Sequence, residues 1–365
     1  MSRVTIKVGG KLLTGWESVD ISKSMTSLCG SFGMAQSATN DNGVTTFLPV
    51  FPGDRVSVEL EGAAFLTGWV DAISPKVDAK SHGIGVEGRE ITCDLVDCGR
   101  EPKSPIHWKN LTLPQLIREL VQPFGLTFTD TGAPVGSPFK LFSAEPGDSV
   151  FQTIQKAASV RGLLPMTLPD GSITTVVEGK GRATDRLVYG LNILSASGKY
   201  DNKGRFSAYH VTGQAPVSPG SSYFGGAKKH TSTAGATDPL VTRYRPLVVV
   251  ESGEVRGTMA QTRANWEATT RAAKASTVEV TVRGWTQSDG TLWECARTAS
   301  VEIPYLFGPG ARELLISAVR YSYGPGGTVA VLSLVTPGAF KQLPENKKAA
   351  VSTPDAWASV RRAQK

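Results

Sequence analysis

The sequence has few of the residues that build metal centres. Its 365 residues include four histidines and four cysteines, Cys29, Cys93, Cys98 and Cys295. Cys93 and Cys98 are separated by four residues, but no second close pair of cysteines or histidines completes a zinc-binding set. Isolated cysteines are usually buried and inert, and they are typical of a reducing compartment. We therefore expect inert thiols and no metal or other cofactor.

Common catalytic motifs are missing as well. There is no Walker loop, G-x-S-x-G elbow or H-E-x-x-H sequence. Residues 83–88 match the dinucleotide-binding glycine pattern, which functions only where a strand turns into a helix. Here alternating residues continue to Leu95, which predicts one glycine-rich strand over residues 83–95. Asp94 and Asp97 would face opposite sides of a strand or cap a turn, so an acid–base pair is not indicated and we expect no enzyme.

No hydrophobic run is long enough to span a membrane. The longest uncharged apolar stretch, residues 328–340, is short and is broken by Pro337-Gly338. The N-terminal residues alternate like a strand and have no signal-peptide core. We expect a chain that is neither secreted by that route nor stably anchored in a membrane.

What the sequence does contain is typical of a globular β protein. Hydrophobic residues make up 40% and charged residues 19%, too apolar for a disordered chain. The 39 glycines and 22 prolines are spread along the sequence and favour many short strands and turns. The length allows two or three domains.

Two distant stretches share one pattern. Residues 52–71 and residues 278–303 each contain alternating apolar and polar residues, a glycine turn, and tryptophan in or beside a strand. Such alternation predicts strands with one buried face, and its recurrence predicts a pseudo-repeat. Residues 1–100 accordingly form a first β module, with turns at 41–43, 52–53 and 61–62, and residues 186–340 form a second.

Residues 101–185 have a different character and predict a small α/β domain. Apolar residues at helical spacing indicate a helix over residues 113–124, which begins near Pro114. Ser149 and Gln152 form a capping-box pattern that starts a second helix ending near Arg161. Asp170-Gly171 then predicts the turn of a hairpin.

The second β module has two predicted interruptions and is followed by a tail. Residues 254–275 have few helix breakers and indicate a helix. Residues 214–238 are rich in Gly, Ser, Thr and Ala, and we interpret them as a long loop. Residues 341–365 form a polar tail in which Trp357 is the only plausible anchor.

A net charge of +7 raises the possibility of nucleic-acid binding. The basic residues are dispersed, however, whereas a dedicated binder usually gathers them on one face among stacking aromatics. The alternative that remains open is an OB-like barrel that binds nucleic acid through a group of five residues: Arg243, Tyr244, Arg245, Trp285 and Trp293.

Several motifs occur in an order that resembles contractile-tail baseplate hubs. Later segments agree in order as well, and the resemblance extends from Val4 to about Pro337. It is strongest to the phage Mu-type hubs of the late-control D family, and it includes the T-even tail hub and the N-terminal part of type VI secretion spike proteins. The motifs are Pro52-Gly53-Asp54-x-Val56-x-Val58, Phe65-x-Thr67-Gly68-x-Val70-Asp71, Gly88–Thr92 with Asp94–Asp97, 192–194, 243–247, 263–267 and 314–316.

This resemblance implies a structural part of a phage tail. The expected fold is mainly β, with two tail-tube-like β-barrels and the small α/β domain inserted between them. Three chains would place six barrels in a ring that joins the sixfold tail tube, or a distal tube protein, to a trimeric spike, beside other baseplate proteins. DNA would only pass through the channel, and the protein would reside in the virion after assembly in the host cytoplasm.

The resemblance also assigns the tail a partner. Its position after the second barrel is where relatives meet the spike, so we expect Trp357 to be buried in that contact, with Arg361 and Arg362 at its rim. Some relatives carry lytic domains, but no paired carboxylates or metal-ligand set indicates one here.

Overall fold

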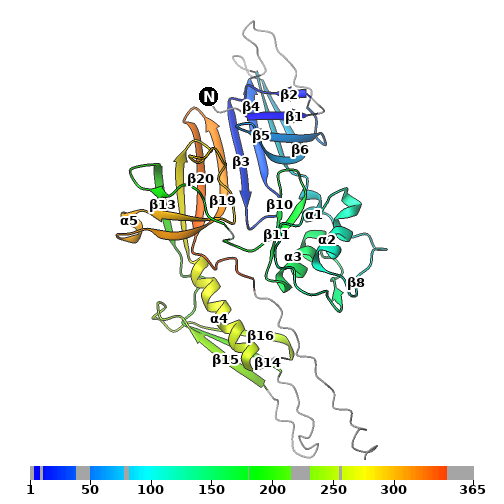
Figure 1. Ribbon diagram of the computed structural model, residues 1–365, viewed down its shortest axis with the longest axis vertical. Coiled ribbons are helices and arrows are strands. Elements are labelled where there is room, and N and C mark those ends of the chain that lie inside the picture. The colour runs from blue at the N-terminus through cyan, green and yellow to red at the C-terminus, as the bar shows by residue number, and fades with distance from the viewer. Residues whose placement is uncertain are drawn as a thin grey trace, which may run out of the picture.

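The computed structural model describes residues 4–8, 11–37, 50–77, 82–179, 181–214, 231–254 and 257–342. β-Strands are the main secondary structure, and three bodies are visible: a long curved β assembly, a compact helical insertion beside it, and a small sheet with one long helix below it (Figure 1). The prediction of a mainly β fold with a small insertion of mixed helices and strands is confirmed.

Among the described residues, thirteen strands from the N-terminal and C-terminal parts of the chain form one sheet. Along the sheet the order is β13-β17-β20-β19-β3-β4-β7-β6-β5-β1-β2, and β18, with β12 beyond it, branches from β19. The N-terminal strands are β1 Val4–Val8, β2 Lys11–Leu13, β3 Ser18–Ser24, β4 Ser31–Ser37, β5 Arg55–Leu60, β6 Ala63–Val77 and β7 His82–Glu90. The C-terminal strands are β12 Leu187–Val188, β13 Ile193–Tyr200, β17 Ser276–Arg283, β18 Thr298–Glu302, β19 Arg312–Gly324 and β20 Gly327–Val335.

The two halves of this sheet meet at one antiparallel strand pair. Strand β3 pairs with β19 over six residues, from Val19 opposite Tyr323 to Ser24 opposite Ala318. A single hydrophobic core runs beneath both halves and contains the fully buried Ile21 and Tyr321. Period-two alternation explains this burial, because one face of each strand turns toward the shared core.

The insertion has its own core. Its elements are α1 Cys93–Asp97, β8 His107–Trp108, α2 Leu113–Val121, a 3-10 turn Gln122–Phe124, β9 Phe142–Ser143, α3 Val150–Val160, β10 Leu164–Thr167 and β11 Ile173–Val176. Thr112 and Ser149 both form capping boxes, with Gln115 and Gln152 respectively. The predicted helices and the hairpin turn at Gly171, whose φ is +88°, are confirmed.

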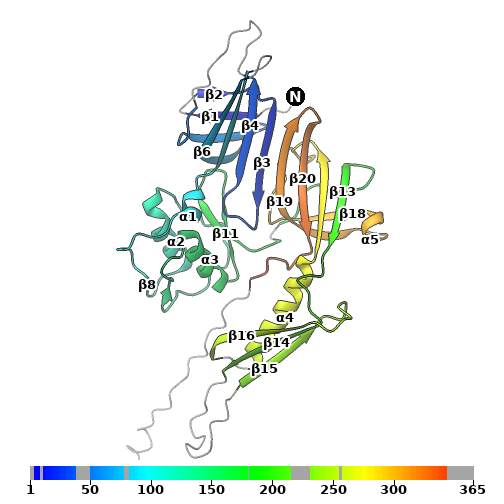
Figure 2. The ribbon, with the colours of Figure 1, turned by 180° about the vertical axis from the view of Figure 1, so that it is seen from behind.

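A small third unit hangs from the C-terminal half of the large sheet. It contains β14 Ala208–Gln214, β15 Thr231–Thr237, β16 Pro246–Glu254 and α4 Gly257–Lys274, with sheet order β15-β14-β16. The predicted helix is confirmed as α4, which covers one face of this sheet (Figure 2). A one-turn helix, α5 Pro304–Phe307, lies beside β13.

Two local predictions were wrong. The strand expected over residues 83–95 ends at Glu90, because the chain turns at Ile91 and begins α1. The loop expected over residues 214–238 contains β15, whose small residues pair along their whole length with β14. Residues 215–230 and the turn expected at 41–43 lie outside the described residues.

The repeated pattern does not correspond to the same local strand pairing. In the first stretch β5 and β6 pair directly. In the second, β17 pairs with β13 and β20, whereas β18 pairs with β12 and β19. Similar alternation therefore arises from shared burial on one face and not from a copied hairpin.

Gly88, from the 83–88 pattern, and Gly68, on the paired strand β6, allow β6 and β7 to pack closely. A Cβ on Gly88 would lie 2.1 Å from the Trp69 carbonyl oxygen, and one on Gly68 would lie 2.0 Å from that of Arg89. Both glycines flank the irregularity in the β6–β7 pairing after Val70. The glycine pattern is thus part of a strand, as predicted, and no side chain fits at these two positions.

Candidate interaction surfaces

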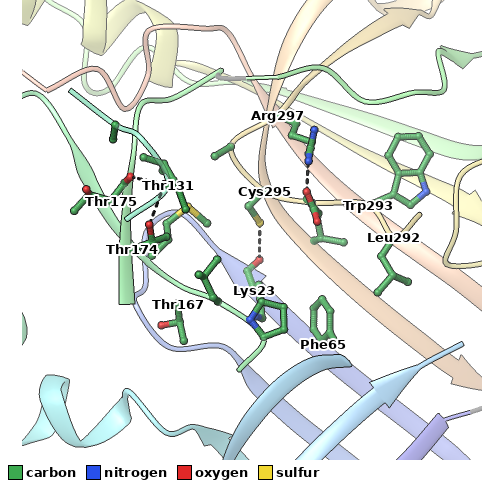
Figure 3. Close-up of a pocket in the computed structure, with 18 of the residues that line it drawn as sticks. Lys23, Phe65, Thr131, Thr167, Thr174, Thr175, Leu292, Trp293, Cys295 and Arg297 are labelled. Carbon is green, nitrogen blue, oxygen red and sulfur yellow. Dashed lines mark hydrogen bonds and ion pairs between the residues drawn. The ribbon is translucent and has the colours of Figure 1, made fainter. Parts of the chain in front are cut away.

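The insertion and both halves of the large sheet meet at an apolar cavity of about 360 Å³. Phe65 contributes from β6, Met166 and Val176 from the insertion, and Leu292 and Cys295 from the loop before β18. Figure 3 shows these groups arranged around one space, with Thr131, Thr174 and Thr175 on one side and Cys295 on the opposite side. The cavity is therefore a junction between parts of the chain far apart in sequence.

Polar groups around the cavity bond to one another. Thr131 and Thr174 hydroxyls lie 3.0 Å apart, and Thr167 Oγ1 donates to the Leu28 carbonyl at 2.8 Å. Arg297 Nε donates to Glu294 Oε2 at 2.6 Å. The Thr167 bond ties the insertion to the connection between β3 and β4, whereas the other two bonds lie within the insertion and within the loop before β18.

A buried ion pair lies beside this cavity. Lys23 Nζ is 2.5 Å from Glu90 Oε1, and the Glu90 side chain is only 1% exposed. The backbone N–H of Gly30 donates to Glu90 Oε2 at 2.6 Å, and Lys23 also lies 4.8 Å from the Phe65 ring centroid. Burial raises the pKa of Glu90, while Lys23 and the Gly30 N–H act in the opposite direction. Lys23 lies on β3 and Glu90 ends β7, just before the insertion, so the pair ties β3 to the point where the sheet leads into the insertion.

The thiols differ in exposure. Burial raises the pKa of Cys295 to about 12, and its Sγ donates to the Lys23 carbonyl at 3.4 Å. Burial also raises the pKa of Cys93 to about 12, so both remain protonated at neutral pH. Cys98, in contrast, is exposed, so the expectation of burial was wrong for this cysteine.

Asp94 and Asp97 lie on α1, and Asp97 belongs to an ion-pair group. Arg89 Nη1 is 2.9 Å from Asp97 Oδ2, and Arg89 Nε is 2.7 Å from Asp71 Oδ2. The two carboxylates raise the pKa of Arg89 further. This group joins β6, β7 and α1, which is a structural role.

The residues of the nucleic-acid alternative do not form one surface. Trp285 and Trp293 are 1% and 2% exposed and belong to the main core. Arg245 packs 5.0 Å from the Phe206 ring centroid and donates to the Lys203 carbonyl, whereas Tyr244 is 91% exposed. Buried tryptophans cannot stack on bases, so the structure does not support this alternative.

Both ends of the large sheet are free among the described strands. At one end lies β2; at the other lies β13, with β17 as its single neighbour. Exposed apolar side chains gather on or beside β13, namely Tyr189, Leu191, Leu194 and Tyr200. A free edge with apolar neighbours is a surface on which another chain can add a strand. The sequence analysis did not identify this edge, although the closely spaced apolar residues Tyr189, Leu191 and Leu194 could have indicated it.

The predicted partner residues Trp357, Arg361 and Arg362 lie outside the described residues. Their assignment remains a prediction. None of the helices in the described part of the chain combines the length and apolar character that crossing a membrane requires.

Sequence comparisons place these features in a known class of phage tail protein. Three families match successive segments: the N-terminal domain of Mu phage baseplate assembly protein GpP-like proteins at residues 3–90, the second domain of gp44-like baseplate hub proteins at residues 92–176, and the fourth domain of GpP at residues 256–344. The baseplate hub protein gp44 of Escherichia phage Mu is 34% identical over 293 residues, which are 80% of this chain and 76% of that protein.

Solved structures agree with this result. A 43 kDa tail protein from prophage MuSo2 of Shewanella oneidensis aligns over 93% of this chain and all of its own, with a TM-score of 0.81 and 27% identity. A tail protein from Neisseria meningitidis aligns over 93% of this chain and 98% of its own, with a TM-score of 0.75 and 22% identity. An E. coli type VI secretion component shares the fold at 10% identity and a TM-score of 0.55, over 93% of this chain and 79% of its own.

The fold is thus that of a phage tail hub. The chain belongs to the Mu-type baseplate hub family, as the resemblance of its motifs predicted. It is a structural component of the virion's tail baseplate and not an enzyme.

Proposed function

We propose that this protein is a trimeric adaptor between the tail tube and the spike of a contractile tail. The observation that supports this proposal most directly is the single sheet, which contains both β halves and ends in two different free edges, β2 and β13. If each half acts as one tail-tube-like barrel, three chains supply six units that match a sixfold tube. Association of two different edges is head-to-tail, and such contacts close into rings.

We assign four regions to this function: residues 1–100 and 186–340 as the two tube-like barrels, 101–185 as the α/β domain, and 341–365 as a tail. Strand pairing between edges of neighbouring chains would remove the exposed edges at β13 and β2. Strand β4 is not available for such pairing, because β3 and β7 occupy both of its edges. The ring would leave a channel for DNA, without a surface built to grip it.

The remaining partners follow from this position. The ring would contact the tail tube or a distal tube protein on one side, and a trimeric spike and other baseplate proteins on the other. Trp357 would be buried against the spike, with Arg361 and Arg362 beside it. Assembly would take place in the host cytoplasm.

Light scattering on the purified chain, with and without its spike protein, tests the proposal. We expect the mass of a trimer, and a ring with a central channel in electron micrographs. Leu194→Asp should weaken the trimer by placing a charge on the β13 edge, whereas Leu141→Asp, in the insertion, changes a side chain of similar exposure and should not. A stable dimer would contradict the proposal.

Truncation after residue 341 tests the role of the tail separately. We expect the truncated protein to retain its oligomeric state and to lose affinity for the spike. Unchanged capture of the spike would show that the tail is only a terminus. A salt-dependent shift of a labelled oligonucleotide by the intact protein would instead favour a nucleic-acid binder.

A further inference from the structure

The small β14–β16 sheet has one covered face and one open face. Tyr209 and Val211 of β14 point toward α4, where they meet Ala260 and Ala264. Alternation along the strands places nine other residues on the opposite face in three rows. We call this the uncharged sheet face; its members are Thr237, Ala208 and Pro246, then Gly235, His210 and Val248, then Thr233, Thr212 and Val250.

The composition of this face is unusual for a surface in contact with water. Val248 and Val250 are 61% and 75% exposed, and His210 is also exposed. None of the nine residues is Lys, Arg, Asp or Glu; the next paired row, beyond the irregularity in β16, contains Glu254, which is paired with Gln214. Soluble surfaces carry about 25–35% charged residues, so about two or three would be expected among nine positions. The face therefore has the composition of a covered surface.

Its size limits what can cover it. Three strands about 4.8 Å apart, each spanning about five residues of which three lie on this face, present roughly 200–300 Å². A stable complex usually buries about 800 Å² on each partner. The face is too small to hold a partner alone, so its occupant must already be held in place by another contact.

The absence of charge indicates which occupant fits. A partner of different sequence can match each charge with an opposite one, so charged residues would be tolerated or useful there. Around a threefold axis, however, a residue beside the axis meets its own counterparts in the other two copies, so a charge there would meet the same charge. An uncharged face of small and β-branched residues is suited to that self-contact.

We propose that the uncharged sheet face packs against the same unit of neighbouring copies around the threefold axis of the assembly. This inference rests on the proposed trimer, which supplies the larger contact that brings the copies together. The β14–β16 unit lies at the opposite end of the molecule from β1 and β2 (Figures 1 and 2). The trimer would therefore be held at two levels, at the edges of the large sheet and at these small sheets below them.

The test places a charge at the centre of the face. In the full-length protein, Val248→Asp would bring three carboxylates together, and we expect the concentration for half-dissociation of the trimer to rise at least tenfold. Leu141→Asp is the control, because Leu141 is 57% exposed and Val248 is 61% exposed. Val248→Thr keeps the shape of the side chain and should give a smaller shift. Equal thermal unfolding of monomeric Val248→Asp and wild type would show that the fold is retained.

Chemical cross-linking gives an independent readout. Thr233→Cys in a Cys98→Ser background, which removes the exposed native thiol, should be linked between copies by a short bis-maleimide. A trimer in which Val248→Asp has no effect and Thr233→Cys gives no cross-link overturns this inference while leaving the proposed function in place. A wild-type protein that is never trimeric contradicts the proposed function itself. Loss of spike capture by a Val248→Asp trimer of unchanged stability would assign the face to the spike and overturn the self-contact.

Discussion

The insertion and the β14–β16 unit differ in how completely they bury their apolar surfaces. In the insertion, helices α2 and α3 and the β10–β11 hairpin enclose a core that includes the fully buried Leu116, Ile117 and Ile154. In the small unit, α4 covers one face of a three-stranded sheet and the other face stays open. A closed core gains its stability within the chain, whereas an open apolar face gains it only when something covers it. The insertion therefore buries its apolar residues within the chain, whereas the small unit would bury its open face only when another surface covers it.

The largest effect is expected where the insertion and the large sheet meet. Lys23→Met removes the partner of the buried Glu90 carboxylate and should lower the free energy of unfolding by about 3–5 kcal/mol, as measured by urea denaturation at pH 7. The double variant Lys23→Met with Glu90→Leu removes both charges and should recover much of that loss. A single variant as stable as wild type would show that the ion pair has no role at the junction.

This loss should depend on pH. Burial raises the pKa of Glu90, and removal of Lys23, which lowers that pKa, raises it further. The folded state then binds the proton more tightly than the unfolded chain, so the stability gained is present below the unfolded pKa of about 4.5 and is lost as pH rises through the folded pKa. The deficit of Lys23→Met should therefore be smaller at pH 5 than at pH 8.

A matched pair of truncations tests the comparison directly. Leu116→Ala opens a cavity in the closed core and should cost about 2–5 kcal/mol in urea denaturation. Val250→Ala removes two methyl groups from the open face and should change the stability of the monomer by less than about 0.5 kcal/mol. A large loss for Val250→Ala in monomeric protein would mean that the open face is already covered within the chain.

Helix capping should have an intermediate effect. Ser149 Oγ accepts a hydrogen bond from the backbone N–H of Gln152 at 3.2 Å, and Gln152 Oε1 accepts one from the backbone N–H of Ser149. Ser149→Ala should lower the free energy of unfolding by about 1 kcal/mol. Ser149→Asp, which retains an acceptor, is the control and should stay close to wild type.

The sequence predicted elements whose signals are local. The capping box at Ser149 and the turn at Gly171 are set by residues a few positions apart, and both were predicted. The capping box at Thr112 was not recognised, although the start of its helix was placed correctly. Strand β15 was missed because its Thr, Ala and Gly side chains carry little hydrophobic contrast, and its pairing with β14 decides its structure. The end of β7 was misplaced because alternation continued into α1, where tertiary contacts override the pattern.

Contacts between distant parts could not be derived from local patterns. Alternation places Glu90 on a predicted strand, but its pairing with Lys23 depends on β3 and β7 lying on either side of β4. The free edge at β13 and the uncharged sheet face likewise require the strand order. The family resemblance predicted the class of protein, whereas the surfaces that serve assembly became visible only in three dimensions.

The pairing of β3 with β19 has a consequence during synthesis. Ser24 and Ser317, which are bonded across this junction, are 293 positions apart in the chain. At about 5–20 residues per second, a ribosome needs roughly 15–60 s to make the intervening segment. Throughout that time one edge of the nascent β3 lacks its native neighbour and can pair with other emerging chains. The N-terminal half must therefore remain available without aggregating until nearly the whole chain has left the ribosome.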